Sequence, residues 1–475
     1  MSHYGYVSEQ LITGRLWPAR RRRRSGPAPA PAPRELDVER FRSHFDFPGT
    51  GRVVTNNAAT SQTPRELVEL FGRLTPWYEG VHRGQSAASR RMTAEFEESY
   101  DTIATWVNAP SRRCIATYRN TTEAINAVMY SLLTEFRDGD NVVTTLMEHN
   151  SNFVPWYALA REVLPRLGRR VECRVARFDH ETGELDLDHL AELVDERTKL
   201  VCVTGASNFL GTKPPLQRVR EIADASGYRR PDGTPGSLLL VDAAQLAPTS
   251  VIDVVALGVD YLAFSFHKVL APFGVGVLYA REPLLEHSLP FLYGGDMIAE
   301  GRVSPDLVEY NELPWKYAAG TPNVLGVIAS AQALRLLVDL ALDPVEPWFS
   351  SPRPLPRAEV ESAMSLVSRH VQALTDVALR RTQALPGVRI YGPGPGVPRS
   401  PLVAFTVKGR DPQAVALALD EYGVEARAGC HCATLAHLDL KLTPPATCRL
   451  SFAAYTSAED VDRALGALER VIGFG

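Results

Sequence analysis

Short apolar runs alternate with longer helix-like segments between about residues 70 and 340. Four of these runs are rich in aliphatic and β-branched residues, and they cover residues 141–146, 200–204, 237–241 and 260–265. Runs of this length and composition are typical of buried β-strands, and the segments between them are long enough for helical crossovers. The pattern therefore predicts an α/β fold with a largely parallel sheet.

The pattern changes in the C-terminal third of the chain. A proline-rich stretch at residues 343–357 precedes a long helical pattern at 358–385, and strand-like runs return at 402–407 and 448–452. Proline ends helices and is frequent in the connections between domains. We therefore expect a linker or insert here, followed by a smaller α+β domain at residues 358–475.

The rest of the chain divides into three parts. Residues 71–342 form the predicted large domain, in which residues 229–236 have the composition of a surface loop inserted before a strand. Residues 36–70 form an N-terminal segment that we expect to pack with the small domain. Residues 1–35 contain five consecutive arginines, Arg20 to Arg24, and an alternating Pro-Ala run, which together predict a flexible basic arm.

The charge of the whole chain bears on what such an arm does. A basic arm can dock on nucleic acid or acidic lipid, or it can be a solvated tail. The chain has 51 basic and 55 acidic residues, for a formal net charge of −4. Because the rest of the protein is slightly acidic, we favour a solvated tail and expect no nucleic-acid partner.

Cysteine content and hydropathy bear on whether the protein is secreted, membrane-bound or cytoplasmic. Six cysteines in 475 residues are too few for a disulfide-stapled secreted scaffold. The N-terminus has no apolar run with a cleavage site, although its arginines leave organelle import open. The most apolar segment, residues 317–334, includes Gly, Thr, Pro, Asn, Ser and Gln, so we expect no membrane span and a cytoplasmic protein.

Lys268 and Asp242 are the first candidates for chemistry. Lys268 follows the strand-like run at 260–265, and Asp242 follows the run at 237–241. A lysine at a strand end is ordinarily solvated, but 26 residues separate the two side chains, which is one strand-helix-strand step and predicts that they share a crevice. A buried carboxylate needs a cationic partner, and a desolvated lysine can form a Schiff base. Pyridoxal phosphate (PLP) satisfies both with its ring nitrogen and its aldehyde.

Two further segments supply polar groups to the same region. Residues 119–126 place Asn120, Thr121 and Thr122 before a helix-forming run, which predicts a helix N-terminus able to bind phosphate, or one that is simply capped. His149 follows the strand at 141–146. Its imidazole can stack on a flat ring, although a histidine at a strand end is more often only hydrogen-bonded.

Seven short blocks occur in the same order as in a known family. They are Thr121-Thr-Glu, Met147-Glu-His, Ser207-Asn-Phe-Leu-Gly-Thr, Val241-Asp-Ala-Ala-Gln, Ser265-Phe-His-Lys, Ala319-Gly-Thr-Pro-Asn and Arg427-Ala-Gly-Cys-His-Cys-Ala. In these blocks the chain resembles the class V aminotransferases, in particular the cysteine desulfurase and selenocysteine lyase branch with SufS-type enzymes. The likeness extends from about Phe41 to the C-terminus and implies a PLP-dependent transferase of fold type I, with a sheet of the seven-stranded type.

The resemblance implies a role for each matching residue. Lys268 would bind the PLP aldehyde, Asp242 the ring nitrogen and Gln245 the ring hydroxyl, while His149 would stack on the ring. The phosphate would be bound by the following residues: Thr121 or Thr122, Ser265, His267, and Thr321 of the neighbouring subunit of a homodimer. Asn208, Arg449 and Arg427 would hold the substrate, and the planar guanidinium of Arg449 suits a carboxylate.

The same resemblance assigns the reaction to Cys432. It aligns with the cysteine that attacks the substrate sulfur and carries it away as a persulfide, which requires a thiolate on a loop close to a proton acceptor such as His149. Two alternatives remain: Cys430, His431 and Cys432 as half of a zinc site or a redox pair, and Cys432 as an inert buried thiol. A second Cys/His cluster is missing from the sequence, so we expect no metal.

The chain departs from the SufS-type pattern at three positions. Cys430 replaces the first of two histidines before the nucleophile, Asn150 replaces a frequent histidine, and Phe266 replaces a small residue before His267. A second thiol at position 430 could take up the persulfide or form a disulfide. The short spacing from Arg427 to Cys432 resembles the branch that typically needs an acceptor protein for sulfur.

These observations lead to one expected function and its alternatives. We expect a homodimeric PLP-dependent cysteine desulfurase that converts L-cysteine to L-alanine and passes the Cys432 persulfide to an acceptor protein. The alternatives are a related class V enzyme, such as a selenocysteine lyase, a C-S lyase or an aminotransferase, and a non-catalytic protein that binds sulfur or metal through Cys430 and Cys432.

Overall fold

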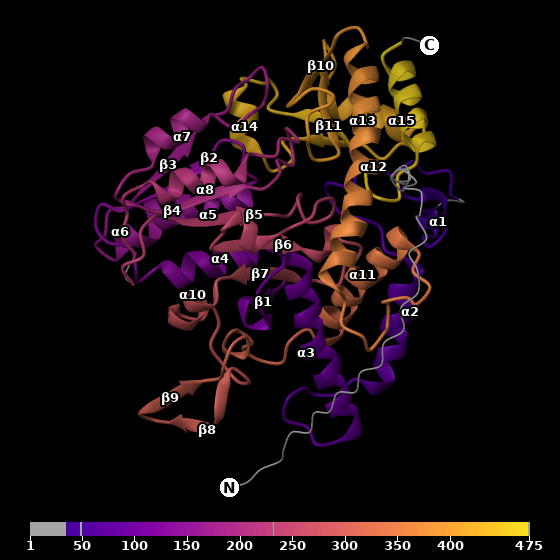
Figure 1. The fold of residues 1–475 in the computed structure, drawn as a ribbon. Helices are drawn as coiled ribbons and strands as arrows, with labels where there is room; N and C mark the ends of the chain where they lie inside the picture. Colours follow the sequence, from indigo (N-terminus) through magenta and orange to yellow (C-terminus); the bar gives the residue numbers. More distant parts are fainter. Residues whose placement is uncertain (1–34, 48–49, 231, 474–475) are drawn as a thin grey trace, which may run out of the picture. The chain divides into compact units, whose positions relative to one another are not determined.

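The computed structural model describes residues 35–47, 50–230 and 232–473, which belong to one compact unit. The predicted basic arm, apart from Glu35, lies outside the described residues. Within them, a seven-stranded sheet has the order β1-β7-β6-β5-β4-β2-β3 (Figure 1). Its strands are β1 (Ile115–Tyr118), β2 (Asn141–Thr145), β3 (Glu172–Ala176), β4 (Thr198–Thr204), β5 (Leu238–Asp242), β6 (Tyr261–Ser265) and β7 (Gly276–Ala280).

The directions of these strands confirm the predicted largely parallel α/β sheet. Strands β3, β2, β4, β5 and β6 pair in parallel, while β7 is antiparallel to both β6 and β1. The strands β2, β4, β5, β6 and β7 are buried along their whole length. Their apolar runs lack a polar alternation because helices cover both faces of a parallel sheet.

Helices surround the sheet and connect its strands (Figure 1). The helices are α1 (Val38–Arg42), α2 (Arg65–Leu74), α3 (Ala87–Val107), α4 (Thr121–Leu132), α5 (Val154–Ala158), α6 (Leu164–Arg166), α7 (Leu187–Leu193), α8 (Leu216–Asp224), α9 (Val254–Leu257), α10 (Glu282–His287), α11 (Val324–Leu342), α12 (Arg357–Gln383), α13 (Pro412–Asp420), α14 (Thr434–Asp439) and α15 (Ala458–Val471). The long helical pattern predicted at 358–385 corresponds to α12.

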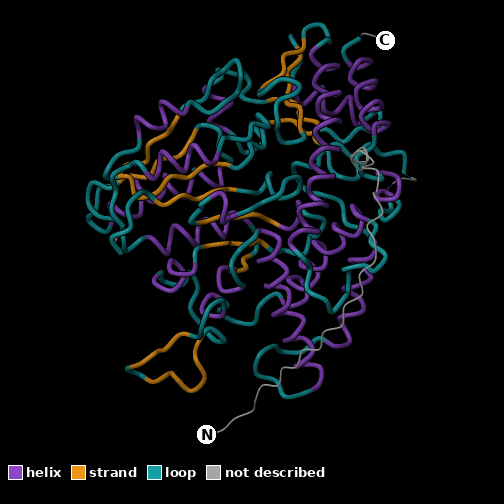
Figure 2. Tube along the Cα trace, viewed as in Figure 1, coloured by secondary structure: helices purple, strands orange, loops and turns teal. Residues whose placement is uncertain are grey.

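A second sheet and a separate hairpin complete the strands, as Figure 2 shows. The second sheet has the order β10-β11-β13-β12, and the hairpin pairs β8 with β9. Their bounds are β8 (Ile298–Ser304), β9 (Leu307–Tyr310), β10 (Val388–Tyr391), β11 (Leu402–Val407), β12 (Arg427–Gly429) and β13 (Thr447–Ser451). The predicted strands at 402–407 and 448–452 therefore lie side by side in an antiparallel sheet.

The N-terminal segment contacts this second sheet. Val53 forms a bridge with Val424, and Asn56 forms one with Ser451. The ring centroids of Phe45 and Tyr455 lie 4.7 Å apart. The segment therefore contacts the C-terminal part of the chain. The division of the chain into domains remains a prediction.

Helix α11 is the one helix among the described residues that is long and apolar enough to cross a membrane by length and composition. In the structure 89% of its apolar window is buried inside the protein. Its Arg335 is completely buried and donates hydrogen bonds to the carbonyl oxygens of Ser351 at 3.1 Å and Arg353 at 2.8 Å. The helix is therefore a core element, and it fastens the proline-rich stretch at 343–357.

Candidate active site

The carboxyl ends of five parallel strands meet at one edge of the large sheet and supply polar side chains there. Thr121 follows β1, His149 follows β2, Asn208 follows β4, Asp242 ends β5 and Lys268 follows β6. All five line one cavity of about 260 Å³. Ligands in α/β proteins bind outside the carboxyl ends of the strands, so this edge is the candidate active site.

Asp242 lies at the floor of the cavity with few hydrogen-bond donors. It is 3% exposed, and the backbone N–H of Ala244 donates to its Oδ1 at 2.9 Å. Burial raises the pKa of the Asp242 carboxyl, against the Ala244 hydrogen bond and the positive charge of Lys268. A buried carboxylate at a cavity wall is stabilised by a cationic partner, and the protonated ring nitrogen of PLP provides one.

Lys268 lies on the same cavity in a short 3-10 turn, Phe266–Lys268, that directly follows β6. Burial, opposed by Asp242 and assisted by the charges of Arg449 and Arg427, lowers the pKa of its amine to about 8. An amine with this pKa has a large neutral fraction near pH 8. The neutral form is the nucleophile that condenses with an aldehyde.

The opposite end of the cavity is formed by the N-terminus of α4. Asn120 caps this helix through its Oδ1, which accepts a hydrogen bond from the Glu123 backbone N–H at 3.0 Å. The helix starts directly against β7, where a Cβ on Gly276 would lie 2.4 Å from the Asn120 carbonyl carbon. Only glycine allows this close approach. The helix N-terminus therefore points its positive end at the cavity, which suits a phosphate group.

Two hydroxyl pairs hold this end of the site. The Thr121 backbone N–H donates to Ser265 Oγ at 2.7 Å, and the hydroxyls of the two residues lie 2.6 Å apart. The hydroxyl of Thr122 lies 2.6 Å from that of Ser151. Thr121 and Thr122 line the cavity, whereas Ser265 is 2% exposed and lies behind Thr121. The hydroxyl of Ser265 therefore holds the start of α4 in place.

His149 is fixed by the residue two positions later. Its Nδ1 accepts the backbone N–H of Ser151 at 3.1 Å and lies 2.9 Å from the Ser151 hydroxyl. This places the proton of the neutral ring on Nε2. Burial lowers the pKa of His149 to about 4, with a further contribution from Lys268 and the two site arginines. The ring is therefore neutral at ordinary pH, as required for stacking on a cationic heterocycle.

A buried carboxyl next to His149 was not predicted as a site residue from the sequence. Glu148 is 1% exposed and accepts hydrogen bonds from Thr145 Oγ1 at 2.6 Å, Asn152 Nδ2 at 2.7 Å and the Thr204 backbone N–H at 2.9 Å. Burial raises its pKa to about 8, against these three hydrogen bonds. Glu148 ties the ends of β2 and β4 together, and so positions the turn that carries His149.

Two arginines from the small sheet face the cavity from the other side. Arg427 on β12 and Arg449 on β13 are directly opposite each other in an antiparallel pair, so their side chains share one face. Arg449 is 2% exposed and donates from Nη1 to the Asn208 carbonyl at 2.7 Å, but its Nε has no hydrogen-bond partner. Burial, reinforced by Arg427, lowers its pKa to about 9.

The two arginines place positive charge at the cavity. No carboxylate among the described residues forms an ion pair with Arg427 or Arg449. The amide oxygen of Asn208 beside them is also buried without a partner. Two adjacent guanidinium groups with a free buried N–H are suited to bind a carboxylate from a substrate.

The loop between β12 and α14 places Cys432 at the cavity wall. The backbone N–H of Asn150 donates to the Cys432 carbonyl at 2.6 Å, and Asn208 Nδ2 donates to the His431 carbonyl at 2.6 Å. Both donors belong to the large-sheet part of the chain. The two hydrogen bonds therefore dock the loop directly over the cavity that contains Lys268.

The remaining predicted residues fall in three places. Gln245 and His267 line the cavity, and Gln245 Nε2 donates to the Ala58 carbonyl at 2.7 Å. Ser265 lies behind the wall. Thr321 is exposed on the surface and does not line the cavity of its own chain. Roles for these residues in binding a cofactor remain predictions.

Eight lining residues were not among the predicted site residues. They are Ala58, Ala59, Asn120, Ser151, Thr204, Ala206, Ala244 and His431. Asn120, Ser151 and His431 lie next to predicted site residues, so proximity in sequence was an available signal. Ala58 and Ala59 come from the N-terminal segment, and their small apolar side chains gave no signal. Within the described part of the chain, no group of three or more His, Cys, Asp or Glu side chains is arranged to hold a metal ion.

Sequence comparisons define the class of protein. The profile of the family "Aminotransferase class-V" matches residues 53–348 and 359–464. Since this is most of the chain, the protein belongs to the aminotransferase class-V family, as the ordered sequence blocks predicted.

Individual similar proteins have names that give an activity within this family. The chain is 35% identical over 444 residues to a probable cysteine desulfurase of Halobacterium salinarum, covering 91% of this chain and 96% of the relative. It is 34% identical to a cysteine desulfurase of Dickeya dadantii, with the same coverage of 91% and 96%. The crystal structure of the cysteine desulfurase CsdA from Escherichia coli superposes with a TM-score of 0.76 at 31% identity, covering 92% of this chain and 98% of the other.

Proposed function

We propose that the protein is a PLP-dependent cysteine desulfurase that converts L-cysteine to L-alanine and carries the sulfur on Cys432. One observation carries this proposal: Cys432, Lys268 and Asp242 line the same cavity, although they come from different elements of the fold. The names of the similar proteins support the same activity.

The cavity fits PLP at both ends. Lys268 would hold the aldehyde carbon, and Asp242 would pair with the ring nitrogen. His149 would cover one face of the ring, and Gln245 would reach the ring hydroxyl. The N-terminus of α4 with Thr121, Thr122 and His267 would hold the phosphate, with Ser265 behind them and Thr321 supplied by a neighbouring subunit. When bound, PLP supplies an electron-withdrawing ring that makes the proton on the substrate Cα more acidic.

The side chains of the protein orient the substrate. The guanidinium of Arg449 would bind the carboxylate of L-cysteine through its free Nε–H and one Nη, with Arg427 and the Asn208 side chain alongside. This holds the substrate sulfur on the side of the cavity where Cys432 lies. The positive charges of the two arginines also favour a substrate that carries a carboxylate over an amine that lacks one.

Lys268 then transfers protons, and Cys432 accepts the sulfur. The amine of Lys268, with a pKa of about 8, can accept the Cα proton and return a proton to carbon. The thiolate of Cys432 attacks the substrate sulfur: a bond forms between Cys432 Sγ and that sulfur, and the carbon–sulfur bond breaks with its electron pair on carbon. Protonation of that carbon gives alanine, and the sulfur remains on Cys432 as a persulfide.

Three further features belong to the same proposal. The protein acts as a homodimer, because Thr321 is exposed in the isolated chain and the hairpin of β8 and β9 carries exposed apolar side chains, with Val303 62% exposed. It passes sulfur to an acceptor protein, because the short spacing from Arg427 to Cys432 resembles the branch of the family that needs one. It works in the cytoplasm, where six free cysteines stay reduced.

Turnover with L-cysteine tests the proposal. The holoenzyme is incubated with L-cysteine with and without a thiol reductant, and alanine and sulfide are measured. We expect alanine in both cases and sulfide with reductant. Cys432→Ser should lose sulfide release, whereas Cys173→Ser, which alters a half-buried thiol on β3, should not. Full turnover by Cys432→Ser would contradict the proposal and favour a related lyase or aminotransferase.

A further inference from the structure

Two thiols share the short loop between β12 and α14. Cys430 and Cys432 are both free and both partly exposed, whereas Cys114, Cys202 and Cys448 are buried. Cys432 lines the cavity, and Cys430 is not among its lining residues. One loop therefore presents one thiol inside the site and another outside its wall.

The backbone of this loop is fixed at three consecutive residues. The Cys430 carbonyl accepts the Ala433 N–H at 2.8 Å, and the carbonyls of His431 and Cys432 accept hydrogen bonds from the large-sheet part at 2.6 Å each. His431 and Cys432 have left-handed backbones, with φ of 52° and 57°. These hydrogen bonds hold the loop backbone, and rotation of the cysteine side chains moves the two sulfur atoms.

The spacing of the two cysteines is compatible with contact between their sulfur atoms. Two residues span at most about 7 Å between Cα atoms even when fully extended. Bonded cysteine pairs have Cα atoms roughly 4.4–6.8 Å apart. Since His431 is in a left-handed rather than an extended conformation, the Cα atoms of Cys430 and Cys432 are closer than the extended limit. Direct sulfur exchange within the loop therefore fits the spacing of the two residues.

Cys430 has a hydrogen-bond partner in the neighbouring helix α14. The hydroxyl of Thr434 donates to Cys430 Sγ at 3.6 Å. This contact orients the Cys430 side chain, and a thiolate is the form of a cysteine that attacks a persulfide.

We propose that Cys430 is a second sulfur carrier, which takes the outer sulfur from the Cys432 persulfide and presents it outside the cavity. The thiolate of Cys430 attacks the terminal sulfur, so a bond forms between that sulfur and Cys430 Sγ. The bond from that sulfur to Cys432 Sγ breaks, and its electron pair leaves Cys432 as a thiolate. The exchange conserves oxidation state and needs no further reactant. It rests on the proposed desulfurase activity and moves the sulfur from a thiol that lines the cavity to one that does not.

A single-turnover experiment on the holoenzyme tests this relay. Enzyme is mixed with less than one equivalent of L-cysteine and quenched with an alkylating agent at successive times. Released alanine is measured, and fragmentation of the peptide containing both cysteines locates the extra sulfur. We expect the sulfur on Cys432 first and then on Cys430, with comparable final amounts because two similar thiols exchange with an equilibrium constant near one.

Variants separate the order of the two thiols. Cys432→Ser should leave no sulfur on Cys430, and Cys430→Ser should leave all of the sulfur on Cys432 and slow its transfer to a small external thiol several-fold. Cys173→Ser is the matched control and should behave as the unaltered protein. The slowed transfer is measured separately from alanine release, which precedes the relay.

Each other result has a distinct meaning. Alanine release with sulfur confined to Cys432 at all times overturns the relay and leaves the desulfurase function standing. A Cys430–Cys432 disulfide with released sulfide also overturns it, because the inner sulfur was then attacked. Sulfur on Cys430 in Cys432→Ser reverses the roles and overturns it as well. No alanine and no bound sulfur contradicts both the relay and the proposed function.

Discussion

Asp242 and Lys268 lie at the carboxyl ends of two neighbouring parallel strands, β5 and β6, and both line one cavity. Burial acts on them in opposite senses: it raises the pKa of the Asp242 carboxyl and lowers the pKa of the Lys268 amine to about 8. Each shift favours the neutral form of its group. A ligand with a cationic end would stabilise the buried Asp242 carboxylate, and its electrophilic end would react with the neutral Lys268 amine. PLP has both ends.

Replacement of Asp242 tests the cationic end. Asp242→Asn removes the negative charge and keeps the shape, so it removes a charge-assisted hydrogen bond worth about 1.5–3 kcal/mol. We expect kcat for L-cysteine to fall about tenfold to a hundredfold, since 1.4 kcal/mol is roughly tenfold. Steady-state kinetics measure this effect. Asp188→Asn, on an exposed carboxylate, should leave kcat unchanged, and an equal loss there would contradict the assignment.

The pH dependence of cofactor loading tests the amine. Lys268 reacts in its neutral form, which predominates above its pKa of about 8. The rate of PLP incorporation into apoprotein should therefore rise with pH through about 8 and level off above it. The charge of Asp242 raises this pKa, so Asp242→Asn should move the midpoint to lower pH. A rate that still rises above pH 10, as for a solvated lysine, would show that burial does not govern this group.

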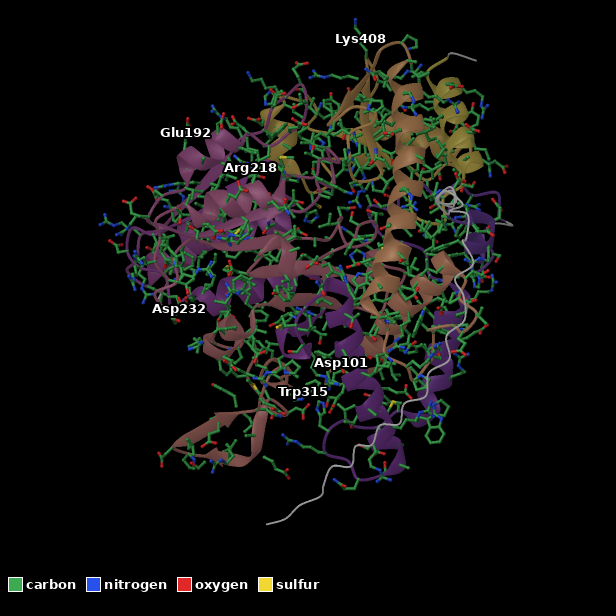
Figure 3. The ribbon with its side chains drawn as sticks, viewed as in Figure 1. Asp101, Glu192, Arg218, Asp232, Trp315 and Lys408 are labelled. Carbon is green, nitrogen blue, oxygen red and sulfur yellow. The ribbon has the colours of Figure 1, made fainter. Side chains whose placement is uncertain are left out.

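The carboxylate site depends on the geometry of Arg449. Arg449→Lys keeps the charge but loses the planar fork, so substrate binding should weaken. We expect KM for L-cysteine to rise about tenfold or more, with a smaller change in kcat. Arg218→Lys is the control, because Arg218 extends from the surface of α8 (Figure 3). An unchanged KM in Arg449→Lys would exclude this residue from the carboxylate site.

The close approach of α4 to β7 tests the phosphate end. An added Cβ in Gly276→Ala would lie 2.4 Å from the Asn120 carbonyl carbon, so the backbone at the start of α4 must shift. We expect weaker PLP binding, measured by fluorescence titration, and a loss of about 1–3 kcal/mol in unfolding free energy. Gly394→Ala is the control because no atom lies within 4 Å of its added Cβ. Unaltered PLP affinity in Gly276→Ala would show that the N-terminus of α4 does not bind the phosphate.

Much of the fold could be predicted because its central strands are buried on both faces. Uninterrupted apolar runs marked β2, β4, β5 and β6 to within two residues. The pattern did not predict the antiparallel direction of β7 or the hairpin of β8 and β9. Strand direction depends on the path of the connecting chain, and β8 and β9 have few buried residues to mark them.

The site could be predicted where chemistry and position coincide. Lys268 and His149 each follow a buried strand and Asp242 ends one, so their sequence positions specified the edge of the sheet where they meet. Ser265 stays a prediction: its place in a sequence block suggests contact with phosphate, and in the structure its hydroxyl contacts Thr121. The contribution of the N-terminal segment through Ala58 depends on long-range packing that no local pattern reveals.

Borohydride reduction of the holoenzyme followed by peptide mapping tests the central claim most directly. The sequence contains only six lysines, so the position of a reduced pyridoxyl group can be assigned without ambiguity. We expect the group on Lys268 and its loss from that peptide in Lys268→Arg. A pyridoxyl group on another lysine, or on none, would contradict the assignment of Lys268.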